Sequence, residues 1–352
     1  MKTLLLSLTT ATLVVVGILF MPSPIDSIAV TPSQAIALEG PWHSNDALQA
    51  AQITALPPGQ YGGEDVARDK LGCLYTGTED GSILRKCPYS EWEQLLNTGG
   101  RPLGLAFDQQ QHLIIADADK GLLRMTPKFE LQVLANKYQG QPLGLVDDVD
   151  IGSDGTVYFS DASTRFSLDD VMLDILDGRP SGRLFAYHPA TGKLELLAQE
   201  LAFANGVAVA ADQSYVLVNE TFRYRTSKVW LAGERRGQVE PFLQALPGLP
   251  DGIARADNGT YWLAFYGLRP EMVDRLHQSP WLKNQLAKLP KALAPVPPAY
   301  GLIVQVGSDG QVLQTLHDQA AVAIGGVTSV QPEKDGLYLG TLHMNRLAKL
   351  PY

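Results

Sequence analysis

A short strand–turn–strand pattern recurs six times along the chain, and it limits the possible folds more than any other feature of the sequence. The clearest copy, residues 203–218, is an apolar strand, a polar turn and a second strand rich in β-branched residues. The other copies occupy residues 64–76, 102–115, 147–159, 251–263 and 328–339. Most copies continue into a third and a fourth strand. Because stacked repeats bury their faces against each other, the pattern predicts an all-β fold, a six-bladed β-propeller with short helical insertions over one face.

The sequence divides into three predicted parts. We expect a signal or anchor segment over residues 1–21, a Pro-, Ser- and Ala-rich linker over 22–58, and the propeller over 59–352. Two insertions, Phe166 to Pro180 and Leu268 to Pro298, carry apolar residues at helical spacing. These insertions are predicted to be short helices on one rim, where they form either a lid or packing decoration.

The N-terminus has the character of an export signal. Lys2 precedes an uncharged, mostly apolar run from Leu4 to Phe20, which is long for a signal-peptide core and slightly short for a spanning helix. We favour an uncleaved anchor over a cleaved signal, since the small-residue site Ala35-Ile36-Ala37 lies far downstream. A buried core helix is the third interpretation. An anchor with Lys2 in the cytoplasm predicts an exported protein on the periplasmic or extracellular side.

The net charge of the chain limits the classes of molecule that it can bind. The formal net charge is -9 and no dense Lys/Arg run occurs, which argues against nucleic acid and anionic membrane surfaces and suits a cation or a neutral substrate. Membrane contact is therefore expected through the N-terminal segment only.

Cys73 and Cys87 flank the hairpin-turn signal Asp80-Gly81, which places them nearly opposite each other. We predict a cross-strand disulfide; the alternative is two buried free thiols.

Polar residues at the start of several first strands form a candidate metal site. First strands line the central channel of a propeller, so Glu64, Asp147, Asn205 and Asp251 are expected to converge at one mouth. Three carboxylates and one amide oxygen suit Ca²⁺ better than Zn²⁺. Without a cation, the like charges would raise each other's pKa values. The alternative is that each residue makes a turn to its own backbone.

Two further acids follow these positions directly. Asp65 and Asp148 come after Glu64 and Asp147, and successive strand residues point to opposite sides. Asp65 and Asp148 are therefore predicted either to help hold a possible second metal ion or to accept backbone amides.

Several motifs carry a family resemblance that covers nearly everything after residue 37. The motifs are residues 62–67 (GGEDVA), 101–108 (RPLGLAFD), 147–150 (DDVD), 158–163 (YFSDAS), 203–207 (FANGV), 246–251 (LPGLPD) and 337–342 (LYLGTL). In order and phase they resemble the strictosidine synthase-like branch of the SMP-30/gluconolactonase and paraoxonase superfamily. The resemblance implies a six-bladed propeller with a channel calcium and, in many members, lactonase or arylesterase activity. The apolar N-terminus is similar to that of the membrane-anchored animal members.

The resemblance also implies site residues. The family's calcium glutamate falls on Glu64, an asparagine on Asn205 and the aspartate on Asp251. Asp147 is an acid where the family has a second asparagine.

The chain departs from the family pattern at other positions. Gly252 stands where paraoxonases have a further asparagine, and Leu103 where they have a histidine, which argues against their histidine-based mechanism. Residues 320–330 contain no acid, although strictosidine synthases place a catalytic glutamate there. This absence argues against the Pictet–Spengler condensation.

These observations predict a calcium-dependent hydrolase of lactones or esters. Ca²⁺ would polarise the carbonyl, and Asp251 would orient or deprotonate the attacking water or attack directly. Phe222 and Tyr266 are candidates for the substrate pocket, or are packing aromatics. The sequence contains no Gly-x-Ser-x-Gly, His-Glu-x-x-His, P-loop or Cys-x-x-Cys motif. The alternatives are a non-catalytic, membrane-tethered binding propeller and, more distantly, a strictosidine synthase-type condensation.

Overall fold

The computed structural model describes residues 20–293 and 298–352. The chain forms two compact units. Unit 1 comprises residues 1–32, 169–179 and 270–297, and unit 2 comprises residues 33–168, 180–269 and 298–352. Most of the predicted anchor lies outside the described residues. Within the described ranges, no helix is long and apolar enough to cross a membrane.

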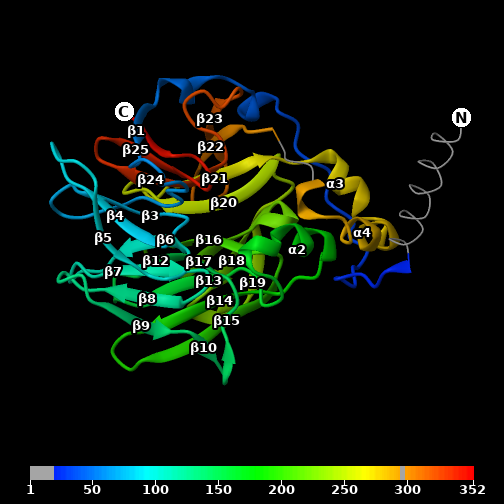
Figure 1. The fold of residues 1–352 in the computed structure, drawn as a ribbon, viewed down its shortest axis with the longest axis horizontal. Coiled ribbons are helices and arrows are strands. Elements are labelled where there is room, and N and C mark those ends of the chain that lie inside the picture. Colours follow the sequence, from blue (N-terminus) through cyan, green and yellow to red (C-terminus); the bar gives the residue numbers. More distant parts are fainter. Residues whose placement is uncertain (1–19, 294–297) are drawn as a thin grey trace, which may run out of the picture. The chain divides into compact units, whose positions relative to one another are not determined.

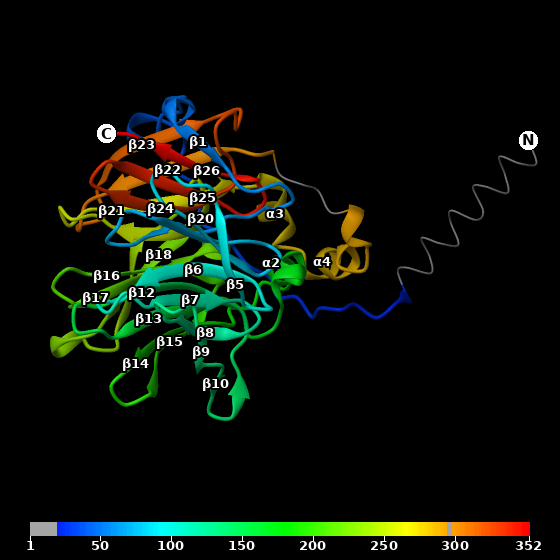
Figure 2. The same cartoon turned by 60° about the vertical axis from the view of Figure 1, so that its left-hand side comes forward.

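Unit 2 consists of six four-stranded antiparallel sheets, which confirms the predicted six-bladed propeller (Figures 1 and 2). The first blade contains β2 (Ala67–Arg68), β3 (Leu74–Gly77), β4 (Ser82–Lys86) and β5 (Glu93–Asn97), and the second contains β6 (Pro102–Phe107), β7 (Leu113–Asp117), β8 (Gly121–Met125) and β9 (Leu131–Ala135). The third contains β12 (Val146–Ile151), β13 (Val157–Asp161), β14 (Gly182–His188) and β15 (Lys193–Leu201), and the fourth contains β16 (Ala204–Val209), β17 (Tyr215–Glu220), β18 (Arg225–Trp230) and β19 (Val239–Leu243). The fifth contains β20 (Gly248–Arg255), β21 (Tyr261–Leu268), β22 (Gly301–Val306) and β23 (Val312–Asp318). A small hairpin, β10 (Lys137–Tyr138) and β11 (Gln141–Pro142), links the second and third blades.

The sixth blade closes the ring with a strand from the other end of the chain. It contains β24 (Val327–Glu333), β25 (Gly336–Thr341) and β26 (Arg346–Leu350), and β1 (Gln52–Ala55) pairs with β26 as its outermost strand. The predicted boundary at residue 59 was therefore wrong, because residues 33–58 belong to unit 2 rather than to a linker. The apolar side chains of Trp42 and Leu48, in the short 3₁₀ helices η1 (Gly40–Trp42) and η2 (Ala47–Ala50), are buried in the cores between blades.

The cores lie between neighbouring blades, which explains why the second strand of a blade is buried on both faces. One cluster packs Leu217 of the fourth blade against Leu263 and Val304 of the fifth. Every residue of β17 and β25 is buried. Strands that are covered on both faces read as continuous rather than alternating apolar runs, which is the pattern of the second strand in each repeat. Two further 3₁₀ turns, η4 (Thr221–Arg223) and η5 (Gly233–Arg235), flank β18.

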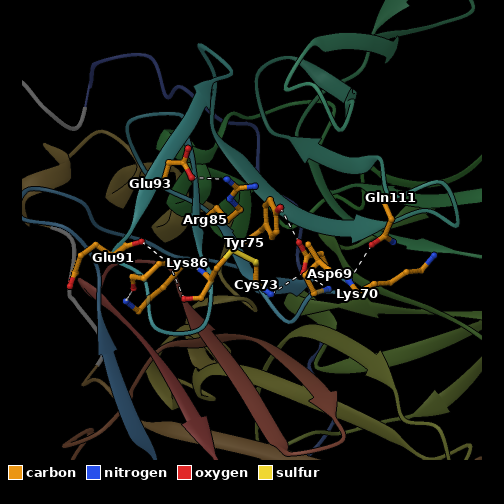
Figure 3. Close-up of a disulfide and its surroundings, with 12 residues drawn as sticks. Asp69, Lys70, Cys73, Tyr75, Arg85, Lys86, Glu91, Glu93 and Gln111 are labelled. Atoms are coloured by element: carbon orange, nitrogen blue, oxygen red, sulfur yellow. Dashed lines mark hydrogen bonds and ion pairs between the residues drawn. A yellow bond between two sulfur atoms is a disulfide. The ribbon is translucent and has the colours of Figure 1, made fainter.

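The predicted disulfide is confirmed. Cys73 and Cys87 are bonded across the hairpin of β3 and β4, one position beyond the pair Leu74 and Lys86 (Figure 3). Beside the bond, the Asp69 carboxylate accepts hydrogen bonds from the backbone N–H of Cys73 (2.9 Å) and from the Tyr75 hydroxyl (3.2 Å).

Unit 1 contains the predicted insertion helices. These are α2 (Val171–Asp177), α3 (Glu271–Leu276) and α4 (Pro280–Leu286), with the 3₁₀ turns η3 (Leu168–Asp170), which begins in unit 2, and η6 (Lys291–Leu293). A segment from the N-terminal part of the unit joins them: the Ile28 N–H donates to the carbonyl of Asp177, and the Val30 N–H to that of His277. The two insertions therefore form one body with residues 25–30, whereas their role as a lid stays a prediction.

Candidate metal and catalytic site

A cavity of about 290 Å³ follows the inner strands of all six blades. Glu64 and Asn205 line it near the starts of these strands, and Arg68, Arg255 and Glu333 line it near their ends. The cavity is thus the central channel of the propeller, and Glu64 and Asn205 lie at the mouth where the inner strands begin. Asp147 and Asp251 do not line the cavity, but their charges act on Glu64.

Regular strand pairing is interrupted at the same place in five inner strands. The register shifts between Pro102 and Leu105, and between Val146 and Val149, Ala204 and Val207, Pro250 and Ile253, and Val327 and Ser329. Asp147, Asn205 and Asp251 each occupy this irregular stretch of β12, β16 and β20. Such bulges redirect side chains and are common near active sites. The repeated bulge therefore presents a polar side chain at the channel mouth in β12, β16 and β20, whereas the bulge of β6 carries Leu103 and Gly104.

Glycines beside the site allow the inner strands to approach closely. A Cβ added to Gly206 would lie 2.3 Å from the carbonyl oxygen of Asp251, and one on Gly252 would lie 2.5 Å from that of Thr328. No side chain can occupy either position without moving the neighbouring backbone. Paraoxonases have an asparagine at the position of Gly252. An asparagine side chain here would collide with the Thr328 carbonyl unless the backbone moved.

The three predicted carboxylates are buried together. Glu64, Asp147 and Asp251 are each less than a tenth exposed. Burial raises the pKa of Glu64 well above its usual range, and the charges of Asp251 and Asp147 raise it further. Burial likewise raises the pKa of Asp147 to about 7, although the nearby charge of Arg101 opposes the shift. Burial and then Asp147 raise the pKa of Asp251, whereas a hydrogen bond from Asn205 lowers it.

The acids of the candidate site differ from the acids next to them in the hydrogen bonds that they accept. The Asp65 carboxylate accepts the N–H groups of Val66 (2.7 Å) and Leu105 (2.8 Å). Among the described residues, burial and neighbouring charges cause the raised pKa values of Glu64 and Asp147, with no hydrogen bond among the causes. Their oxygens are therefore available to a cation.

Asp148 and Asp150 repeat the pattern of Asp65. The Asp148 carboxylate accepts from Val149 (2.8 Å) and from Val207 of the next blade (2.7 Å). The Asp150 carboxylate accepts from Ile151 and from Val209, both at 2.7 Å. Asp65 and Asp148 thus bridge neighbouring blades, the second of the two roles expected for them, and a second metal there stays a prediction without support from these contacts.

The donor set fits a hard cation in chemistry, although it is not a preformed cage. Among residues 20–293 and 298–352, no three His, Cys, Asp or Glu side chains gather tightly enough to hold a metal ion. Glu64, Asp147 and Asp251 nevertheless interact electrostatically, because the charges of Asp251 and Asp147 raise the pKa of Glu64 and the charge of Asp147 raises that of Asp251. Oxygen-only donors in this arrangement are the type that Ca²⁺ accepts with flexible geometry.

Sequence reasoning missed Arg101, which is a cation at the same mouth. Its side chain is buried, and Nη1 donates to the carbonyl of Gly62 (3.1 Å). The buried Nη2 finds no hydrogen-bond acceptor among the described residues. Burial lowers the pKa of Arg101, whereas Glu64 is the strongest of the charges that oppose this shift. Arg101 lies one residue before β6, close to where the other site residues lie in their own repeats, and this position could have identified it from the sequence.

Asn219 was also missed. It lies on β17, the second strand of its blade, and its side-chain amide donates to the carbonyl of Asp251 (2.6 Å). Because this contact joins different blades, no local pattern reports it.

The two predicted substrate-pocket aromatics differ. Phe222 is buried against Phe203, with ring centroids 4.6 Å apart, which is a packing contact. Burial raises the pKa of Tyr266, and the charge of Asp251 raises it further. The Tyr266 hydroxyl therefore interacts electrostatically with the candidate site. Neither residue lines the channel cavity, and their role in a substrate pocket stays a prediction. Leu103, where paraoxonases have a histidine, is a buried apolar residue.

Comparison with known proteins identifies relatives over most of the chain. The family model for strictosidine synthase matches residues 147–234, and the model for the strictosidine synthase-like N-terminal region matches residues 40–86. Strictosidine synthase-like protein 6 of Arabidopsis thaliana is 35% identical over 300 residues, covering 82% of this chain and 79% of the relative. The adipocyte plasma membrane-associated protein of Homo sapiens is 29% identical over 358 residues, covering 95% and 85%.

Solved structures share the fold at low identity. A gluconolactonase from Xanthomonas campestris is similar with a TM-score of 0.62 and 18% identity, over 94% of this chain and 99% of that one. The calcium-binding protein regucalcin from Agrobacterium tumefaciens is similar with a TM-score of 0.59 and 13% identity, over 84% and 90%. At such identities the likeness concerns the propeller itself.

Proposed function

We propose, from the premise that this chain belongs to the strictosidine synthase-like family, that it is a calcium-dependent hydrolase of lactones or esters. The observation that carries the proposal is the buried group of Glu64, Asp147 and Asp251, in which no hydrogen bond from the described residues offsets the raised pKa values of Glu64 and Asp147. Such a concentration of unneutralised acids is costly in a structural role and is relieved by a divalent cation. The gluconolactonase and calcium-binding regucalcin among its structural neighbours support the same choice.

Glu64, Asp147, Asn205 and Asp251 would hold the ion. When bound, Ca²⁺ supplies Lewis-acid polarisation of a substrate carbonyl. Asp251 would accept the proton of the attacking water at a carboxylate oxygen. The Asn205 side chain, which hydrogen-bonds to Asp251, would orient that carboxylate. Arg101 would offset the negative charge that remains after the ion binds.

The test is hydrolysis by the purified full-length protein. A panel of lactones and aryl esters is assayed in CaCl₂ and in EGTA, with Asp251→Asn as the site variant and Asp335→Asn as the matched control. Asp335 lies in the turn between β24 and β25 and pairs with Arg68 and Lys349 at the surface. We expect turnover that requires Ca²⁺, is lost in D251N and is unchanged in D335N. Turnover in EGTA, or full activity of D251N, would contradict the proposal.

A non-catalytic binding propeller is the second candidate. Leu103 and Gly252 favour it, because neither the histidine nor the amide that paraoxonases have at these positions is available. Calcium binding with saturable ligand binding and no turnover across the panel would select this function. Residues 320–330 contain no acid, which supports neither function but disfavours the condensation.

The proposed location is the exported side of a membrane. The disulfide is typical of oxidising compartments, and a relative is named as plasma membrane-associated. We place the anchor at the apolar run of residues 4–20, which lies almost wholly outside the described residues. Resistance of the membrane-bound protein to extraction at alkaline pH, together with an intact N-terminus by mass spectrometry, would establish the uncleaved anchor.

A further inference from the structure

Helix α4 in unit 1 buries a lysine and exposes a tryptophan, which is the opposite of an ordinary surface helix. Lys283 is fully buried, and its Nζ donates to the carbonyl of Ile28 (2.6 Å). Ala287, four residues later, is also buried. On the opposite side, Trp281 is 66% exposed and its neighbour Leu282 is exposed as well. A surface helix normally buries its apolar stripe and exposes its charges, so this arrangement indicates an apolar environment outside the helix.

Unit 1 as a whole exposes many apolar side chains. It contributes eight of the twenty large hydrophobic residues that are exposed in the described chain, although it is much the smaller unit. These residues are Phe20, Met21, Met172, Met272, Trp281, Leu282, Leu289 and Leu293. Single exposed hydrophobic residues are normal, whereas concentrations of them mark interaction surfaces. A tryptophan among aliphatic side chains is typical of a membrane–water interface.

The connection of α4 to the N-terminus places it close to the apolar run. The Ser27 N–H donates to the Asn284 side chain (3.0 Å), and the Ser27 hydroxyl donates to the Pro280 carbonyl (2.9 Å). Phe20, the last residue of the run, precedes Ser27 by seven positions. At an extended spacing of about 3.5 Å per residue, α4 lies within roughly 25 Å of the end of the run.

The charges of unit 1 exclude an electrostatic attachment. Acidic residues outnumber basic ones in the described part of the unit. Two exposed basic side chains are already paired, Lys291 with Asp170 and Arg275 with Glu271. Binding to anionic lipid depends on clusters of unpaired Lys and Arg, so any bilayer contact here must be apolar.

We propose that α4 and the turn after it insert Trp281, Leu282 and Leu289 into the interface of a zwitterionic phospholipid bilayer. This second attachment would hold unit 1 on the membrane surface beside the N-terminal segment. It replaces the expectation that the membrane is contacted through that segment only, and it does not depend on the hydrolase activity. The buried Lys283 fixes which side of α4 faces outward.

The experiment measures quenching of tryptophan fluorescence by brominated lipid. Full-length protein is reconstituted into phosphatidylcholine vesicles with and without dibromo-phosphatidylcholine. Trp281→Phe is compared with the wild type and with Trp92→Phe, a matched control on unit 2 whose indole N–H donates to the Ala55 carbonyl. We expect quenching in the wild type and in W92F, a loss of quenching in W281F, and no effect of high salt.

A second variant keeps the fluorophore and removes its apolar neighbours. Leu282→Ser combined with Leu289→Ser should reduce bromine quenching of Trp281 and open it to aqueous acrylamide, with folding checked by circular dichroism. Equal quenching in wild type and W281F would overturn the proposal. So would an unquenched Trp281, whether it is open to acrylamide or shielded from it by a second copy of the chain or by residues 1–19.

Discussion

At the scale of single residues, the acids along the channel divide by their hydrogen-bond partners. Asp65, Asp148 and Asp150 each accept two backbone amides, one of them from the neighbouring blade. For Glu64 and Asp147, no such donor in the part of the chain that the structure describes contributes to the raised pKa. A carboxylate whose oxygens are already satisfied holds the backbone together, whereas one without donors needs a cation or a proton. Partner count therefore separates Glu64 and Asp147 from the three bridging acids, whereas Asp251, which accepts from Asn205 and Gly252, is a candidate because of its electrostatic interaction with Glu64 and Asp147.

Gly206→Ala should damage the site through the backbone. The new methyl group would meet the Asp251 carbonyl at 2.3 Å and force β16 away from β20. We expect a loss of about 1–3 kcal/mol in the free energy of unfolding, together with weaker calcium binding. Gly267→Ala is the control, since a Cβ there meets no atom within 4 Å. Chemical denaturation and calcium titration of both variants measure the effects, and equal behaviour of G206A and G267A would contradict the close approach.

Arg101→Met should test whether this cation stabilises the acids at the channel mouth. Removing this buried cation removes the positive charge that interacts with Glu64 and Asp147. We expect a loss of about 3 kcal/mol in the free energy of unfolding in EGTA. Ca²⁺ should raise the melting temperature by more in R101M than in the wild type, because the ion no longer competes with the guanidinium.

Differential scanning calorimetry in EGTA and in CaCl₂ measures this difference. Arg124→Met is the control, since the Arg124 guanidinium donates to the Gln132 side chain at the surface. A calcium-induced shift that is the same in R101M and the wild type would show that Arg101 does not act on the ion.

At the scale of elements, the site depends on a bulge repeated in successive inner strands. Each bulge breaks the strict alternation of strand side chains, so adjacent acids such as Asp147 and Asp148 take different roles. The first blade differs, because β2 has only two residues and Glu64 lies before it. This short strand relies on its neighbours: the Thr328 hydroxyl donates to the Glu64 carbonyl, and the Thr76 hydroxyl donates to the Asp65 carbonyl, both at 2.7 Å.

The disulfide should stabilise the first blade through its hairpin. Cys73 and Cys87 are separated by 14 positions, and closing a loop of that size contributes about 3 kcal/mol in the chain-entropy model. The double variant Cys73→Ala/Cys87→Ala should therefore unfold at a lower temperature, and dithiothreitol should lower the melting temperature of the wild type alone. An unchanged melting temperature in the double variant would show that the hairpin is held by its hydrogen bonds.

At the scale of the whole molecule, the ring is closed by β1 and β26, which come from opposite ends of the chain. Closure keeps the six inner strands at fixed distances around the channel and so holds together ligands that come from four blades. Charge repulsion at the channel mouth acts against this closed state. The stability of the entire propeller should consequently report on the ionisation of a few buried acids.

Without metal, the protein should become less stable as the pH rises. The pKa of Asp147 is about 7 in the fold, raised mainly by burial from its ordinary value of 3.8. A raised acid pKa means that the folded state binds more protons, so its contribution to stability falls as pH increases from about 4 to about 7. Thermal unfolding in EGTA across this range should show the decline, and Asp147→Asn should flatten it.

Calcium should reverse this dependence. The ion requires deprotonated carboxylates, so the gain in melting temperature on adding CaCl₂ should grow as the pH rises through the pKa of Asp147. Parallel melting curves with and without Ca²⁺ across the range would argue against a metal at this mouth.

The sequence by itself determined the blade repeat, the insertion helices, the hairpin disulfide and the phase that brings Glu64, Asp147, Asn205 and Asp251 to one mouth. Each of these follows from local periodicity or from counting along a repeat. Only the tertiary structure decided that β1 completes the last blade, that Arg101 lies beside Glu64, that Asn219 holds the Asp251 backbone and that α4 turns its lysine inward. These features are contacts between segments far apart in the chain. No pattern within one segment can report which partner the folded chain brings to it.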